Sequence, residues 1–133
     1  MYKMNEKSLY LTYQDDHFEL PVDSKNWILQ QTQGYSPVEM LASSVAACCG
    51  YVYVSVLENS HVPHLFTRIT LTYERDEAKK ARPLSSIDLT FYLRVEKELQ
   101  PKARHCLRLV LPNCPVVQSL DRDLVINECV QFI

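Results

Sequence analysis

The feature that most constrains the fold is a 20-residue window, residues 38–57, in which Glu39 is the only charged side chain. A window of this length and composition meets the criterion for a membrane span. It also contains Ser43, Ser44, Gly50 and Ser55, and no flanking lysine or arginine would give a span its orientation. These observations favour a helix that is buried on nearly all sides within a soluble protein, with no membrane partner.

A short motif marks the start of this helix. Ser36 can cap it, Pro37 suits the first helical position, and Glu39 completes a Ser-x-x-Glu capping box. Further along, Gly50 interrupts the apolar run, and residues 51–56 alternate and include β-branched valines, a pattern that is also typical of a strand. We predict one central helix over residues 36–58, with a strand over its second half as the alternative.

The segments on either side predict an α+β fold in a single domain, residues 1–133. Alternation within residues 1–34 indicates a hairpin followed by a short strand near Trp27. The rest of the domain, residues 65–133, holds further strands and C-terminal helices. Alternating apolar residues predict two strands there, one with Leu65, Thr67, Ile69, Leu71 and Tyr73 on one face and one with Ile87, Leu89, Phe91, Leu93 and Val95 on one face.

The C-terminal third predicts two helices and a last strand. Helical spacing of apolar residues over 103–111 indicates an amphipathic helix that Pro112 ends, and residues 113–117 resemble a second helix start. Residues 124–132 alternate as a strand, with Glu128 among apolar neighbours. A polar segment over 76–86 has the length of a long hairpin connection. The element order favours an antiparallel sheet backed by helices.

Charge and cysteine content bear on the partners of the protein and on its location in the cell. The chain has 14 Lys+Arg and 16 Asp+Glu, and no basic cluster interleaves with aromatic residues, so a nucleic-acid partner is disfavoured. An odd number of cysteines, five, and a polar start without a secretory signal indicate a reducing, cytoplasmic location. Because one thin sheet cannot wrap a helix that is apolar all round, we expect a second copy of the chain, a homodimer, to cover it.

Three cysteines are candidates for chemistry. Asn-Cys-Pro places Cys114 at a helix start, where free backbone N–H groups favour a thiolate, although a structural cysteine beside the cap is an equal alternative. Cys48 and Cys49 lie in apolar helix, where burial raises a thiol pKa and favours a core role. Since successive helical residues point about 100° apart, we expect at most one of these two to face a given partner.

Other common sites are disfavoured. His61 and His64 have a spacing that could bind a metal, but the proline between them and the lack of a Cys-x-x-Cys pair favour an exposed turn. His17 and His105 are isolated. Glycine-rich phosphate loops, a Gly-x-Ser-x-Gly elbow and a His-Glu-x-x-His motif are absent from the sequence, and we expect no cofactor and no metal.

Two motifs carry a family resemblance. Gly34-Tyr-Ser-Pro-Val-Glu-Met-Leu-Ala-Ser-Ser-Val-Ala-Ala-Cys48, followed 66 residues later by Cys114-Pro-Val, resembles the OsmC/Ohr family of osmotically induced and organic-hydroperoxide-resistance proteins. The resemblance implies an OsmC-like, intertwined homodimer with its sites at the subunit interface. It also implies a peroxidase in which Cys48 attacks a hydroperoxide, becomes a sulfenic acid and forms a disulfide with Cys114, which an external dithiol reduces.

The chain departs from the family's best-known peroxidases at two positions. Their glutamate directly follows the helix-start proline, where this chain has Val38, so Glu39 is a candidate supporting residue turned by about 100°. Their arginine before the helix has no counterpart, since the first arginine is Arg68 and only Lys3, Lys7 and Lys25 precede the helix. The motif is similar to a divergent Pro-x-Glu-Met branch, and we expect a slow peroxidase.

Two other functions stay open. One is a non-catalytic dimer that binds a small apolar ligand in its interface cleft, with the cysteines kept for packing. The other is a structural metal site built from Cys48, Cys114 and a histidine. A fast-reacting, peroxide-sensitive cysteine would favour the peroxidase over the ligand-binding dimer.

Overall fold

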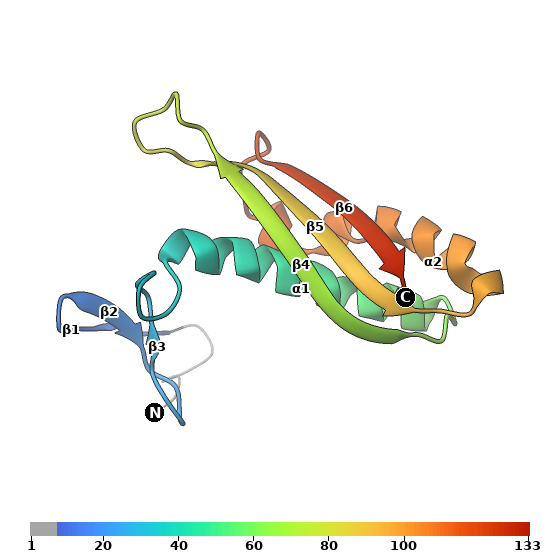
Figure 1. Ribbon diagram of the computed structural model, residues 1–133, viewed down its shortest axis with the longest axis horizontal. Coiled ribbons are helices and arrows are strands. Elements are labelled where there is room, and N and C mark those ends of the chain that lie inside the picture. Colours follow the sequence, from blue (N-terminus) through green and yellow to red (C-terminus); the bar gives the residue numbers. More distant parts are fainter. Residues whose placement is uncertain (1–7) are drawn as a thin grey trace. The chain divides into compact units, whose positions relative to one another are not determined.

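The computed structural model describes residues 8–133, so Lys3 and Lys7 lie outside the described residues. Its chain divides into two compact units, residues 1–41 and 42–133, and the boundary lies within the long helix α1, Pro37–Asn59 (Figure 1). The fold mixes α and β elements, as predicted.

The first unit contains a small antiparallel sheet. Its strands are β1 (Thr12–Gln14), β2 (His17–Leu20) and β3 (Trp27–Ile28), in that order. Asp15 and Asp16 form the two-residue turn between β1 and β2 with φ of 51° and 64°, a left-handed pair typical of tight hairpins. The predicted hairpin is therefore confirmed. Its buried side chains are His17 and Glu19, joined by a 2.7 Å contact, whereas Tyr13 and Phe18 are exposed.

Helix α1 begins as the motif predicts. The Ser36 N–H donates to Glu39 Oε1 over 2.8 Å, and the Glu39 N–H donates to Ser36 Oγ over 3.1 Å, which completes the capping box. The helix continues past Gly50 to Asn59, so the alternative of a strand over 51–56 is wrong. Tertiary packing overrides the strand propensity of residues 51–56, because one face of the helix packs against the core. The buried residues of this face are Ala42, Val45, Ala46, Cys49, Gly50, Tyr53 and Leu57.

The other side of α1 is exposed in this chain. Tyr51 is 80% exposed and Leu41 is 39% exposed. Burial on nearly all sides, which the sequence predicts, is therefore not reached within one copy. Helix α1 is long and apolar enough to meet the criterion for a membrane span. Core helices of soluble proteins meet the same criterion.

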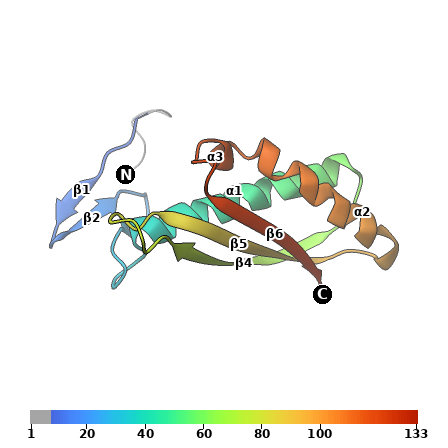
Figure 2. The same cartoon turned by 90° about the horizontal axis from the view of Figure 1, so that it is seen from above.

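The second unit contains the main sheet, in the order β4 (Leu65–Arg75), β5 (Leu84–Arg94) and β6 (Val125–Phe132). Strands β4 and β5 pair antiparallel, but β5 and β6 pair parallel, so the expectation of a wholly antiparallel sheet is wrong. The chain between β5 and β6 returns through helices, and such a crossover delivers a parallel neighbour. Figure 2 shows the helices on one face of this sheet.

The inner face of the main sheet follows the predicted alternation on β5 and departs from it on β4. Ile87, Leu89, Phe91 and Leu93 are buried. On β4 a register shift between Phe66 and Arg68 lets Thr67 bulge, so Phe66 lies opposite Leu93 while Leu65 is exposed. The predicted shared face of Leu65 and Thr67 with Ile69 is therefore wrong, because an inserted residue reverses the alternation.

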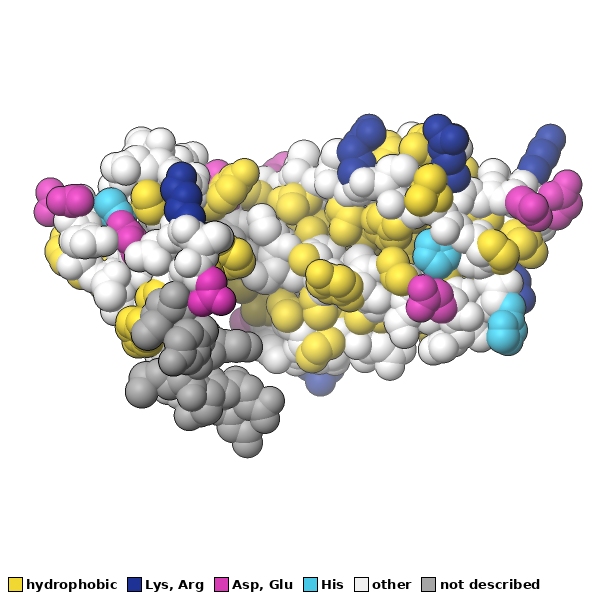
Figure 3. All heavy atoms as spheres, turned by 90° about the horizontal axis from the view of Figure 1, so that it is seen from below, with side chains coloured by type: hydrophobic (Ala, Val, Ile, Leu, Met, Phe, Trp, Pro, Cys, Tyr) yellow, Lys and Arg dark blue, Asp and Glu magenta, His cyan; other side chains and the backbone are white. Residues whose placement is uncertain are grey.

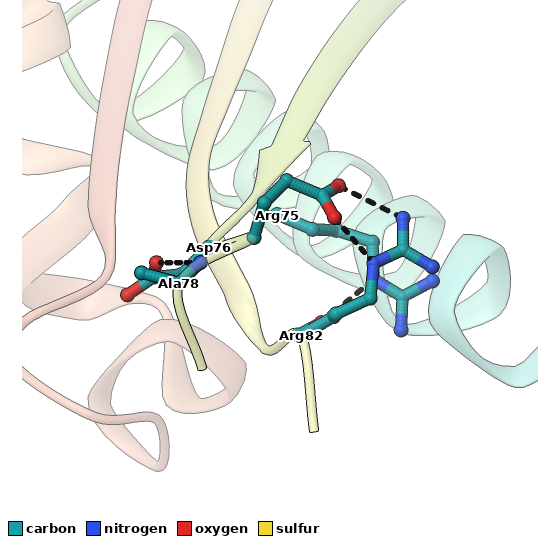
Figure 4. A network of polar contacts seen from close by, with 5 residues as sticks. Arg75, Asp76, Ala78 and Arg82 are labelled. Atoms are coloured by element: carbon teal, nitrogen blue, oxygen red, sulfur yellow. Dashed lines mark hydrogen bonds and ion pairs between the residues drawn. The ribbon is translucent and has the colours of Figure 1, made fainter. Parts of the chain in front are cut away.

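Polar contacts shape the connection between β4 and β5 (Figure 4). Arg82 donates from Nε and Nη2 to the two carboxylate oxygens of Glu77 over 2.8 and 2.9 Å, and Arg75 Nε donates to the Arg82 carbonyl over 2.7 Å. The Ala78 N–H donates to Asp76 Oδ1 over 3.0 Å. Because β5 begins at Leu84, the connection is shorter than the predicted 76–86.

Short helices form the connection between β5 and β6. In place of one helix over 103–111, the chain forms α2 (Gln100–His105) and then the 3₁₀ turns Cys106–Leu109 and Leu111–Asn113. The Ala103 carbonyl, which a continuing α-helix would offer to Leu107, accepts the Tyr53 hydroxyl over 2.7 Å. The predicted second helix, α3 (Pro115–Gln118), starts after Cys114, and Ala103, Cys106 and Val110 are buried. A short 3₁₀ turn, Lys97–Leu99, precedes α2.

Candidate functional site

Three thiols, two in the middle of α1 and one at the start of α3, lie in or against the same hydrophobic core. Cys114, the residue before α3, is fully buried, and its side chain is among the groups that raise the pKa of both Cys48 and Cys49. Cys49 is also fully buried, whereas Cys48 is half-buried. We call Cys48, Cys49 and Cys114 the thiol cluster. All five cysteines of the chain are free thiols in this structure.

The geometry brings Cys48 and Cys114 together and adds Cys49. Cys114 acts on the pKa of both Cys48 and Cys49, and the expectation that at most one of these two faces a given partner stays a prediction.

The surroundings of Cys48 oppose its ionisation more than they favour it. Burial and the hydrogen bond with Cys114 raise the pKa of the Cys48 thiol, while the Val116 backbone N–H, at the start of α3, lowers it. In the described part of the chain, no lysine or arginine is among the groups that act on this thiol. The predicted effect of burial on Cys48 is therefore confirmed.

Cys49 is held more firmly in the thiol form. Burial raises its pKa most, and the neighbouring charges of Cys114 and Glu128 raise it further. A thiolate at this position would lack water on every side. Cys49 is therefore the less reactive of the two adjacent thiols.

Glu128, which the sequence marks as a charged residue among apolar neighbours, was not predicted as a site residue. It lies on β6 opposite Leu89 and shares the inner face with Val130. Its Oε2 atom is buried and, among the described residues, has no hydrogen-bond partner. Burial raises the pKa of this carboxyl to about 7. The available signal was its place in the alternation over 124–132, where every other inward position is apolar.

The remaining candidate residues have other contacts. The Glu39 carboxylate accepts the Ser36 N–H in the capping box. His61 is exposed with a φ of 58°, and His64 Nδ1 lies 2.9 Å from the Val62 carbonyl oxygen. Within residues 8–133 no group of three or more His, Cys, Asp or Glu side chains is arranged to hold a metal ion.

Comparison with known proteins identifies the family. The family model described as "OsmC-like protein" matches residues 30–128. No curated protein matches the chain. Solved structures with the same fold include an OsmC-like protein from Mycoplasma pneumoniae, which has 17% sequence identity and a TM-score of 0.74 and covers 97% of this chain and 99% of its own.

Two further structures show the same fold. A protein from Aquifex aeolicus has 19% identity and a TM-score of 0.74, with 98% of this chain and 99% of that chain covered. The organic hydroperoxide resistance protein OhrB of Bacillus subtilis has 13% identity and a TM-score of 0.63, with 93% and 98% covered. Identities this low establish the fold alone. Since the family model spans well over half of the sequence, the chain belongs to the OsmC-like family.

Proposed function

We propose that this protein is a thiol-dependent peroxidase that reduces organic hydroperoxides. The observation that carries the proposal is a half-buried Cys48 on α1 with the fully buried Cys114, at the start of α3, among the groups that act on its thiol. A peroxidase of this type needs one sulfur that a substrate can reach and a second sulfur beside it. The relative from Bacillus subtilis, described as an organic hydroperoxide resistance protein, supports the choice of substrate class.

The reaction runs through two thiol steps. The Cys48 thiolate attacks one peroxide oxygen, the O–O bond breaks, and the alkoxide leaves and takes up a proton as an alcohol. The Cys114 thiol then attacks the sulfur of the Cys48 sulfenic acid, and the hydroxyl leaves with the Cys114 proton as water. An external dithiol reduces the Cys48–Cys114 disulfide. No cofactor takes part in these steps.

The electrostatics of the thiol cluster support a slow first step. Burial and Cys114 raise the pKa of Cys48, and the Val116 N–H is the group that opposes them. Because the thiolate is the nucleophile, a raised pKa lowers its fraction at neutral pH. A cation from another copy of the chain, such as Lys25, would reverse this effect.

We also propose a homodimer in a reducing compartment, the cytoplasm. Hydrophobic side chains gather on one face of the molecule (Figure 3), and Tyr51 on α1 is 80% exposed. Covering such an area with a second copy is favourable by about 25 cal/mol per Å² of apolar surface. Free thiols at all five cysteines are the state that a reducing compartment maintains.

The proposed peroxidase is tested by mapping the oxidised cysteines. Wild type, Cys48→Ser and Cys114→Ser are treated with an alkyl hydroperoxide and analysed by mass spectrometry. We expect a disulfide to Cys114 in wild type, which Cys48→Ser prevents or slows, and a trapped sulfenic acid on Cys48 in Cys114→Ser. Cys106→Ser and Cys129→Ser are the matched controls, because neither residue belongs to the thiol cluster, and both should consume peroxide at the wild-type rate. Unmodified Cys48 and Cys114 under excess hydroperoxide would refute the proposal.

The alternative of a ligand-binding dimer has a weaker basis. The apolar hollow between α1 and β4 has a volume of about 240 Å³ and is lined by residues that include Tyr51, Val54 and Phe66. Pockets that bind drug-sized ligands hold about 300–1,000 Å³. Inert thiols together with saturable binding of a small apolar probe would favour this alternative over the peroxidase.

A further inference from the structure

An open cavity lies on the surface where the 3₁₀ turn Lys97–Leu99 leads into α2. It has a volume of about 590 Å³ and is lined by Lys97, Gln100, Pro101, Arg104 and His105. Gln100 and Arg104 are separated by one helical turn, as are Pro101 and His105, so the members of each pair lie on one face of α2. The cavity is therefore built on a continuous surface of this helix, to which the preceding turn adds Lys97.

Every charged side chain that lines this cavity is basic. Lys97 and Arg104 are cations at neutral pH, and within residues 8–133 neither forms an ion pair with a carboxylate. Glu96 and Glu98, on either side of Lys97 in the sequence, are exposed and do not line the cavity. Two cations that no carboxylate neutralises create a positive potential around the cavity, which attracts an anion.

Contacts within the chain hold two of the lining side chains in place. Arg108 Nε donates to His105 Nε2 over 2.8 Å, which assigns the proton of the neutral ring to Nδ1 and leaves His105 with one N–H donor. Arg104 Nη1 donates to the Val130 carbonyl over 3.5 Å, and its guanidinium lies over the Phe132 ring at 5.1 Å. A guanidinium has five N–H donors, so Arg104 keeps donors for a ligand.

The helix dipole alone does not account for these basic residues. Basic side chains are favourable in the last turn of a helix, where α2 has Lys102, Arg104 and His105. Lys97 precedes α2, at the end where the dipole disfavours a cation. Lys102 is exposed and does not line the cavity. What Lys97 shares with Arg104 and His105 is therefore the cavity and not a place in the last turn.

We propose that this cavity binds a small organic phosphate monoester, whose phosphate group contacts Lys97, Arg104 and His105. A phosphate monoester carries a charge of about −1.5 to −2 at pH 7 and three acceptor oxygens, which two cations and a neutral donor match better than they match a monocarboxylate. A cavity of about 590 Å³ exceeds the size of one phosphate group and lies within the range of about 300–1,000 Å³ for small-molecule pockets. The organic part therefore has room beside Pro101. The proposal goes beyond the proposed peroxidase and does not depend on it.

The experiment titrates the full chain with three probes while NMR records the backbone amide shifts at low salt. Phenyl phosphate is a monoester with an apolar group, inorganic phosphate lacks that group, and benzoate is a monocarboxylate. Lys97→Gln and Arg104→Gln each remove one cation of the cavity. Lys102→Gln is the matched control, because it removes an exposed cation of α2 that does not line the cavity. Circular dichroism checks that each variant is folded, and the exposed Lys97 decides the test if Arg104→Gln unfolds the chain.

We expect phenyl phosphate to bind saturably, to shift the amides of residues 97–108, and to bind at least about threefold more tightly than either other probe. Lys97→Gln and Arg104→Gln should each weaken its binding about three- to tenfold, and Lys102→Gln should leave it within about 1.5-fold. High salt should weaken binding to the wild type.

Three results would overturn the proposal. Shifts that stay linear up to about 20 mM phenyl phosphate would show that no site exists. Equal weakening by Lys102→Gln and Lys97→Gln would show a general effect of charge and not a site in the cavity. Equal affinity for inorganic phosphate would exclude the organic part of the ligand, and equal affinity for benzoate would exclude selection of a phosphate.

Discussion

The buried carboxyl of Glu128 should make the free energy of unfolding depend on pH, and the substitution Glu128→Gln should remove that dependence. Burial raises the pKa of this carboxyl from 4.5 to about 7, and one pKa unit corresponds to about 1.4 kcal/mol. Because the folded-state pKa lies above the unfolded value, the free energy of unfolding is not reduced by Glu128 below about pH 4.5. It falls as the pH rises and the carboxyl ionises, up to and through about pH 7. At alkaline pH the charged Glu128 therefore costs the fold up to about 3 kcal/mol.

Glutamine keeps the shape of the side chain and removes its charge. We expect the stability of Glu128→Gln relative to wild type to increase by about 2 kcal/mol between pH 5 and pH 8. Urea unfolding at both pH values, followed by circular dichroism, measures the difference. The exposed Glu74→Gln is the control and should show no such trend. A relative stability that is the same at both pH values would refute the reasoning that burial raises this pKa.

Three other predictions follow from single contacts. Ser36→Ala removes the hydroxyl that accepts the Glu39 N–H and should lower the free energy of unfolding by about 1 kcal/mol in urea, whereas an unchanged value would show that the cap is dispensable. Tyr53→Phe loses the bond to the Ala103 carbonyl and should cost about 1–2 kcal/mol in the same assay, which a neutral result would contradict. Sedimentation at low micromolar concentration should show a dimer, and Tyr51→Asp should shift it toward monomer; a folded wild-type monomer there would contradict the dimer.

The sequence by itself determined the features that depend on neighbours along the chain. The capping box at Ser36 and Glu39, the tight turn at the N-terminal hairpin and the helix start after Cys114 all came from local residue preferences. The alternation of β5 also predicted its buried face. The resemblance carried by the Cys48 and Cys114 motifs predicted the family, which the family model confirms.

Only the tertiary structure decided the features that depend on contacts between distant segments. The parallel pairing of β6 with β5 and the bulge at Thr67 depend on how whole strands align, which no local pattern encodes. The same holds for the place of Cys48, Cys49 and Cys114 in or against one hydrophobic core. Cys114 lies dozens of residues from Cys48 and Cys49 in the sequence, and burial in the folded chain raises the pKa of both thiols on α1.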